Sequence, residues 1–257
     1  MIKLHKNLLG KLSVASLLPA ILMLGSGGAL AQLPGNDAAT MYVMVKLFGS
    51  HTAFASKAEM HVLDKSKKET DTLPMKFALL DGRSRMDIDV SQIRSVEMPA
   101  ELLPSLKQMG MEQMTVITRP DKKIILSCYP RMKAYVETPM TTKEETAAAK
   151  AYKTEKTKLG KETIDGHPCE KNKVVLTDSD PKGEKYEATV WNATDLKEFP
   201  VQMQIRSQDS TVVMKFKDVK LGNPGASQFE APAGMTRYTD ATKLLAEATA
   251  KMTGGGK

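Results

Sequence analysis

Apolar and polar residues alternate one by one along much of the chain, which is the pattern of strands with one buried face. Residues 114–140 show it best, because short β-branched and apolar runs around Val116, Ile125 and Val136 are separated by turn residues at 119–122 and 129–131. We expect three antiparallel strands here, with the remaining strands laid against them.

The N-terminal half adds further predicted strands. Residues 54–63 place Phe54, Ala58, Met60 and Val62 on one face, and residues 73–79 continue this alternation into a hairpin turn at 81–84 and a strand at 86–90. Residues 41–48 are apolar at both odd and even positions. We interpret them as a strand that is covered on both faces.

Five more strands are predicted in the C-terminal half, at 154–163, 170–177, 185–191, 201–207 and 211–219. Three segments have helical features instead. They are the apolar three- to four-residue spacing of 93–109, the Thr141–Glu144 capping pattern that opens 141–152, and the segment 240–252, with Leu244, Leu245 and Ala248 on one side.

The number and spacing of these elements predict the fold class. About ten strands that return every ten or so residues indicate an unclosed antiparallel β-barrel, a mainly β half-barrel covered by short helices. We expect one domain over residues 40–238, after a flexible leader at 32–39. A C-terminal helix and frayed tail at 239–257 follow it.

The first thirty-one residues have the composition of a secretory signal peptide. Lys3, Lys6 and Lys11 precede an apolar run over 14–24, and small residues lead to an expected cleavage after Ala31. This run is shorter than the ~20 residues of a spanning helix. We therefore expect an exported, periplasmic protein that does not span the membrane after cleavage.

The charge argues against a nucleic-acid partner. The formal net charge is +7, and it falls to +4 when the three lysines of the signal segment are removed. The remaining excess is spread along the strands and forms no basic block.

Two cysteines, Cys128 and Cys169, lie in the part of the chain expected outside the cytoplasm. Disulfides persist in such compartments, so we expect a Cys128–Cys169 bridge, and two buried unpaired thiols remain the alternative. No C-x-x-C spacing supports redox or metal chemistry.

Three stretches carry a resemblance to a known family: residues 119–137, residues 160–171, and the run from Trp191 through Phe216 to Gly234. They resemble an uncharacterised family of exported bacterial domains that is grouped by fold with the outer-membrane lipoprotein carriers (LolA/LolB-like). The resemblance implies a half-barrel with an apolar concave face. Those carriers take up acylated lipoproteins in that face, which applies here by analogy only.

No catalytic constellation is evident. His51, His61 and His167 share no ligand spacing, and no G-x-S-x-G elbow is present, so we predict neither an enzyme nor a bound cofactor or metal. Asp87 and Asp89 share a strand face with Arg85 and are interpreted as a self-compensating surface row.

Methionine is abundant, with fifteen residues outside the signal segment, and Met109, Met111 and Met114 form a local group. A Cu(I) site is one interpretation of this group. The favoured interpretation is an adaptable apolar lining, since methionine side chains are flexible.

The leading hypothesis is a protein that binds an apolar ligand, a lipid or the acyl chain of an acylated protein, in the concave face of the sheet. An envelope structural or interaction module with a filled core and a protein partner at a strand edge is the alternative. The residues expected to line the ligand site are Met44, Met60, Val62, Met75, Phe77, Met86, Ile88, Met114, Val116, Met203, Met214 and Phe216.

Overall fold

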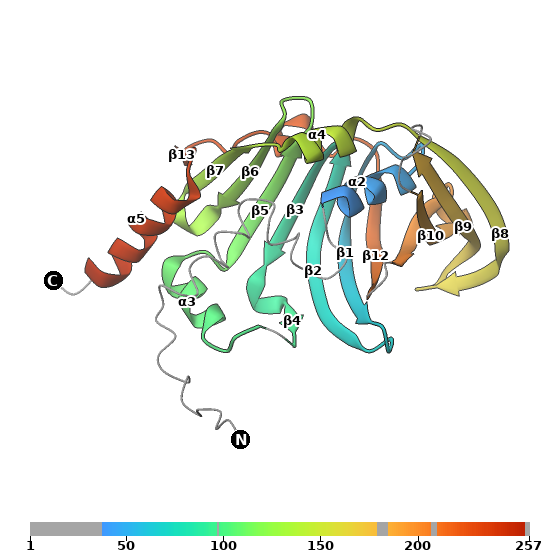
Figure 1. The fold of residues 1–257 in the computed structure, drawn as a ribbon, viewed down its shortest axis with the longest axis horizontal. Helices are drawn as coiled ribbons and strands as arrows, with labels where there is room; N and C mark the ends of the chain where they lie inside the picture. The colour runs from blue at the N-terminus through green and yellow to red at the C-terminus, as the bar shows by residue number, and fades with distance from the viewer. Residues whose placement is uncertain (1–37, 97, 179–184, 207–209, 255–257) are drawn as a thin grey trace, which may run out of the picture.

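A single sheet of thirteen strands forms the body of the protein (Figure 1). The computed structural model describes residues 38–96, 98–178, 185–206 and 210–254. The expected signal peptide and most of the expected leader lie outside these residues. Among the described residues, no helix is both long and apolar enough to cross a membrane.

The predicted half-barrel is confirmed, with more strands than the ten expected. Neighbouring strands follow the order β13-β7-β6-β5-β3-β2-β1-β12-β11-β10-β9-β8, and the short β4 pairs with β2. The strands are β1 (Ala53–Asp64), β2 (Glu69–Leu80), β3 (Arg83–Asp89), β4 (Arg94–Ser95), β5 (Gln113–Arg119), β6 (Ile124–Tyr129), β7 (Ala134–Pro139), β8 (Tyr152–Ile164), β9 (His167–Asp178), β10 (Lys185–Ala193), β11 (Phe199–Arg206), β12 (Ser210–Leu221) and β13 (Thr236–Tyr238). All pairs are antiparallel except β13 with β7.

The sheet is strongly coiled at its β8 end. The Asp165 carboxylate, in the turn between β8 and β9, lies 4.0 Å from the Lys217 ammonium of β12, although β11 and β10 separate β9 from β12 in the sheet. A flat sheet would hold these strands about 14 Å apart at ~4.8 Å per strand. The pronounced twist of antiparallel strands therefore curls this end of the sheet over.

The four α-helices of the described residues contribute to the apolar cluster on one face of the sheet, which we call the helix-covered face; Figure 1 shows where they lie. They are α2 (Ala38–Leu47), α3 (Leu102–Met109), α4 (Thr142–Ala149) and α5 (Ala241–Gly254). The predicted capping box starts α4, where Glu144 N donates to the Thr141 hydroxyl and Thr141 N donates to the Glu144 carboxylate. Leu244, Leu245 and Ala248 of α5 are buried as expected.

The strand predicted at residues 41–48 is wrong, because this segment is helix α2. Met44, Leu47 and Phe48 are buried, and Lys46 between them is exposed. That three- to four-residue spacing is a helical stripe. An apolar run this short does not distinguish a buried strand from a helix by its pattern, and packing against the sheet decides the outcome.

The opposite face of the sheet, which we call the open face, carries a smaller apolar cluster of its own. Ala78, Leu80, Ile117, Leu126, Cys128 and Tyr135 pack there around Phe229. Phe229 ends a short 3-10 helix, Ala226–Phe229, in the C-terminal segment that runs from β12 to β13. We call residues 222–235 the strap.

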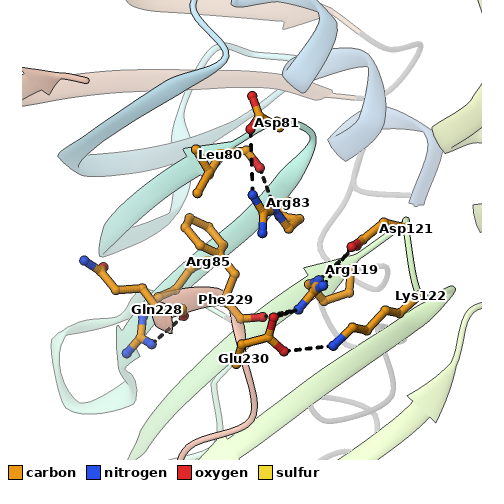
Figure 2. A network of polar contacts seen from close by, with 10 residues as sticks. All are labelled: Leu80, Asp81, Arg83, Arg85, Arg119, Asp121, Lys122, Gln228, Phe229 and Glu230. Carbon is orange, nitrogen blue, oxygen red and sulfur yellow. Dashed lines mark hydrogen bonds and ion pairs between the residues drawn. The ribbon is translucent and has the colours of Figure 1, made fainter. Parts of the chain in front are cut away.

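Polar contacts fasten the strap to the sheet (Figure 2). Arg119 of β5 is 4% exposed, donates from Nη1 to the Phe229 carbonyl at 2.9 Å and lies 2.6 Å from the Glu230 carboxylate. Arg85 donates to the Gln228 carbonyl at 2.9 Å, and the Arg83 guanidinium lies 5.6 Å from the centre of the Phe229 ring. The strap is thus held by charge-assisted hydrogen bonds as well as by apolar burial.

Candidate functional site

The residues predicted to line the ligand site lie together on the helix-covered face. All twelve are buried, with at most 8% of any of them exposed. Eleven belong to one apolar cluster, and Val62 is buried on the same strand face as Met60. For the eleven residues that lie on strands, the inferred parity is therefore correct, because a one-residue slip would have turned a whole set outward.

Strand register aligns these side chains in rows. Met203 of β11 is opposite Met214 of β12, which is opposite Met60 of β1. A parallel row runs through β2, β3 and β5, where Met75 is opposite Ile88 and Ile88 is opposite Met114. The face is thus rich in unbranched, polarizable thioethers, which fill irregular volumes and adapt to different neighbours.

Met44 is the exception, since it reaches this face from α2 and not from a strand. Phe48, directly after α2, is the centre of a group of phenylalanines. Its ring centre lies 4.6 Å from that of Phe54, 5.2 Å from that of Phe216, 5.8 Å from that of Phe199 and 5.9 Å from that of Phe77. The end of α2 therefore occupies the middle of the helix-covered face.

Tyr42 and Ser56 are two of the polar residues within this apolar environment. Tyr42 of α2 donates to the Met140 sulfur across 3.9 Å, and burial raises the pKa of its phenol, with the Glu144 carboxylate adding to the shift. Ser56 of β1 is on the helix-covered face and 7% exposed, and its hydroxyl oxygen is buried without a hydrogen-bond partner. An unpaired buried hydroxyl is unfavourable.

The expected disulfide is not formed, because Cys128 and Cys169 are both free thiols. Cys128 lies on β6 in the open-face cluster, and Cys169 lies on β9 in the cluster of the helix-covered face. Strands β5, β3, β2, β1, β12, β11 and β10 separate them in the sheet. A disulfide requires Cα atoms within roughly 7 Å, and the two thiols lie in separate clusters on opposite faces of the sheet without a bond between them.

Cys169 has polar neighbours, but they do not make it a nucleophile. Its thiol donates to the His167 carbonyl at 3.3 Å, and the His167 ring bonds to Asp195 at 2.8 Å. Burial raises the pKa of the Cys169 thiol above its ordinary value. Nucleophilic cysteines have a lowered pKa, so this arrangement is structural.

The structure offers no metal centre of the usual ligand types. Among residues 38–254 outside the gaps, no three His, Cys, Asp or Glu side chains gather as a possible site. Met109, Met111 and Met114, the group considered for Cu(I), are at most 5% exposed and belong to the apolar cluster. Their burial is the arrangement expected of a lining.

Sequence reasoning missed two clefts on the open face, of about 650 and 680 Å³. Both are lined by Lys57, Lys76, Arg85 and Asp87, so they adjoin across β1, β2 and β3. Arg85 and Asp87 form the expected compensating pair, with Nη2 2.8 Å from the carboxylate. The sign of the clefts in the sequence is the charged residues at alternating positions of β1 and β3, such as Lys57 with Glu59 and Arg85 with Asp87, which are also common on solvated faces.

The fold and the site define a half-barrel with one apolar, helix-covered face. A model of the family described as "Domain of unknown function (DUF4412)" matches residues 70–198, which is half of the chain, so the chain belongs to this family. No curated protein matches the chain. The resemblance found in the sequence and the half-barrel observed here are consistent with this membership.

Several solved structures are similar to the chain at low identity. A LolA superfamily protein from Nitrosomonas europaea is 10% identical, with 75% of this chain and 97% of that chain covered and a TM-score of 0.36. Lipoprotein LppX from Mycobacterium tuberculosis is 12% identical (78% and 95% covered, TM-score 0.35). LprF from Mycobacterium bovis is 11% identical (73% and 97% covered, TM-score 0.37). These distant similarities carry no functional information.

Proposed function

We propose that this protein is an exported, periplasmic binding protein that holds an apolar ligand, a lipid or the acyl chain of a lipoprotein, on the helix-covered face. The observation that carries the proposal is the methionine- and phenylalanine-rich face with α2 laid across its centre. Met44 and Leu47 of α2, and Phe48 directly after it, belong to the apolar cluster of the helix-covered face, where contacts are non-directional. An acyl chain offers the sheet the same kind of contact and can take the place of Met44 and Phe48.

The unpaired hydroxyl of Ser56 supports a ligand with a polar end. It lies on the helix-covered face, in β1, directly opposite Phe77 of β2. A ligand carboxyl or ester oxygen could accept a hydrogen bond from it, which would remove the cost of leaving it unpaired. Ligand sites commonly combine an apolar lining with a few polar groups of this kind.

Native mass spectrometry of the purified mature protein, with lipid extraction, tests the proposal directly. We expect co-purified acyl species, and a fluorescent fatty acid should bind to the delipidated protein. The Met44→Ala variant should bind the fluorescent fatty acid more tightly, since it shrinks the part of α2 that fills the face. It should also lower the free energy of unfolding by about 2–5 kcal/mol.

Leu126→Ala is the matched control, because Leu126 is equally buried but packs in the open-face cluster. It should lose comparable stability and leave fatty acid affinity unchanged. The absence of acyl species, together with equal probe binding by both variants, would rule out the helix-covered face as the ligand site.

A second candidate function, a protein-interaction module, is favoured by strand β8. This edge strand pairs with β9 on one side and with no other strand of the described residues. Most of its thirteen residues are exposed on both faces, including Leu159 at 54%. Such an edge can accept an extended segment of a partner, although its lysines also discourage pairing with a second copy. Exchange of β8 residues for proline would abolish such binding without affecting acyl binding.

A further inference from the structure

Lysines are placed directly opposite one another on the open face. Lys217 of β12 is opposite Lys57 of β1, and Lys57 is opposite Lys76 of β2, so three adjacent strands carry a row of like charges. Like charges in directly opposed positions are destabilising in an antiparallel sheet. Lys215, two residues before Lys217, and Lys220 extend this positive area along β12.

The carboxylates of the same area already have partners. Asp87 bonds to Arg85 and accepts from the Thr115 hydroxyl at 2.6 Å. Asp218 lies 2.7 Å from the Lys57 ammonium, and the Asp89 side chain accepts from Ser91 N at 2.9 Å. Glu59 has the Lys217 ammonium at 3.7 Å and His61 Nε2 at 3.5 Å.

Three lysines of this area form no ion pair within the described part of the chain, although Lys215 is opposite Glu59 in the sheet and Lys220 interacts electrostatically with Asp218. Lys76, Lys215 and Lys220 make no ion pair with any residue that the structure describes. Lys76 lies at the centre and lines both clefts, while Lys220 lines the larger one. Asp87, Asp218 and Glu59 are thus paired with cations, whereas Asp89 at the smaller cleft has only hydrogen bonds from Ser91. The larger cleft has no acid in its lining besides the paired Asp87 and Asp218.

We propose that the open-face clefts bind a phosphate-bearing anion, with Lys76 and Lys220 as its main ligands. Clefts of about 650 and 680 Å³ are within the ~300–1,000 Å³ range of small-molecule sites. Lysine ammonium groups bind phosphate as compact point charges with several donors. The amide of Gln113 lines the smaller cleft and can donate a hydrogen bond to a further phosphate oxygen, whereas the Thr115 hydroxyl beside it already donates to Asp87.

This site is independent of the proposed acyl site, because it lies on the opposite face of the sheet. A bound anion would also relieve the repulsion in the lysine row. The bound anion should therefore raise the free energy of unfolding although these lysine side chains are exposed. This stabilisation should weaken as salt is added.

The test uses inorganic pyrophosphate as the probe, titrated into the full mature protein at constant ionic strength. Calorimetry should show saturable binding, and the melting temperature should rise with probe concentration. The Lys76→Ala/Lys220→Ala variant should lose at least tenfold in affinity. Its melting temperature without probe should equal or exceed that of the wild type, which shows that folding is intact.

Lys156→Ala/Lys185→Ala is the matched control. Both are exposed strand lysines outside the clefts and without an ion pair among the described residues, so the control removes the same charge. It should bind pyrophosphate as the wild type does. Equal loss in both double variants, or no binding by the wild type, would overturn the proposal and leave only general electrostatic attraction.

Vesicles distinguish a free phosphate compound from a lipid headgroup as the source of the phosphate. Phosphatidylcholine vesicles with and without phosphatidylglycerol are mixed with the protein and sedimented. Binding to the anionic vesicles that is lost in the Lys76→Ala/Lys220→Ala variant and competed by pyrophosphate would assign the cleft to a lipid headgroup. Pyrophosphate binding without vesicle binding would assign it to a soluble phosphate compound.

Discussion

The guanidinium of Arg119 and the carboxylate of Glu230 lie 2.6 Å apart and join strand β5 to the strap. The two partners differ in burial, since the Arg119 side chain is 4% exposed and the Glu230 side chain 47% exposed. Arg119 also bonds to Asp121 at 2.7 Å and to the Phe229 carbonyl (Figure 2). One buried cation therefore supports several contacts of the strap.

Replacing Arg119 should cost much more than replacing Glu230. We expect Arg119→Ala to lower the free energy of unfolding by about 2–3 kcal/mol, because hydrogen bonds to a charged group and the packing of its stem are both lost. Glu230→Gln should cost less than about 1 kcal/mol, because solvent screens the half-exposed pair. Urea denaturation measures both values.

Arg237→Ala is a suitable comparison for Arg119→Ala. Arg237 follows the strap on β13 and bonds to Glu137 at 2.6 Å, but its side chain is 54% exposed. Its loss should change the free energy of unfolding by less than about 1 kcal/mol. Equal effects of the two arginine substitutions would contradict the role given to burial.

Stability should fall on acidification through the same contacts. The hydrogen bond from Arg119 lowers the pKa of Asp121, and hydrogen bonds from Lys122 and Arg119 lower the pKa of Glu230. Carboxyl groups with a lowered folded-state pKa stabilise the fold above their unfolded pKa of about 4, and this contribution is lost as the pH falls through the folded value. Urea midpoints measured from pH 6 down to pH 2.5 should drop more steeply for the wild type than for Arg119→Ala. Parallel curves would exclude this linkage.

Both cysteines should be present as unreactive thiols in the folded protein. Cys128 is 0% exposed and Cys169 2% exposed, and burial raises the pKa of Cys128 to about 12. A thiol reagent should label neither residue under native conditions and both in guanidinium, since only the accessible thiolate reacts. An intact mass two hydrogens lower, with no thiols released by unfolding, would instead support a disulfide.

Removing the hydroxyl of Ser56 should not destabilise the protein. Ser56→Ala leaves no unpaired buried oxygen, so we expect the free energy of unfolding to be unchanged or up to about 1 kcal/mol higher. Thr115→Val provides the contrast, because the Thr115 hydroxyl donates to Asp87 at 2.6 Å and its loss should cost about 1–2 kcal/mol. Thermal denaturation of both variants measures this difference, and a marked loss for Ser56→Ala would show that its hydroxyl has a bonded partner in solution.

The local alternation of apolar and polar residues predicts a strand well when one face of the strand is exposed to solvent. The alternation around Met60, Met75 and Met214 gave the correct strand and the correct face, because half-buried strands have a two-residue period. Residues 41–48 lack this contrast. Their helix is determined by the sheet beneath them, which a short window of sequence does not contain.

Contacts between distant segments were not predictable in the same way. Alternation identifies strands but not their order, so it could not show that seven strands separate Cys128 from Cys169. The strap and the lysine row likewise depend on which strands become neighbours. The burial of the eleven strand residues expected to line the ligand site could be predicted, because each needed only the parity of its own strand, whereas Met44 lies on helix α2.

The pairing of β1 with β12 has a consequence for how the molecule forms. β1, the first strand that the structure describes, is completed on one side only after residues 210–221 have been made. The family match at 70–198 contains neither β1 nor β12. Without β1 and β12, no backbone hydrogen bonds would join the strands on the β2 side of the sheet to those on the β10 side. We therefore expect the sheet to fold late and slowly, as in proteins dominated by long-range strand pairing. The newly made chain should stay vulnerable to proteases until its last quarter has been synthesised.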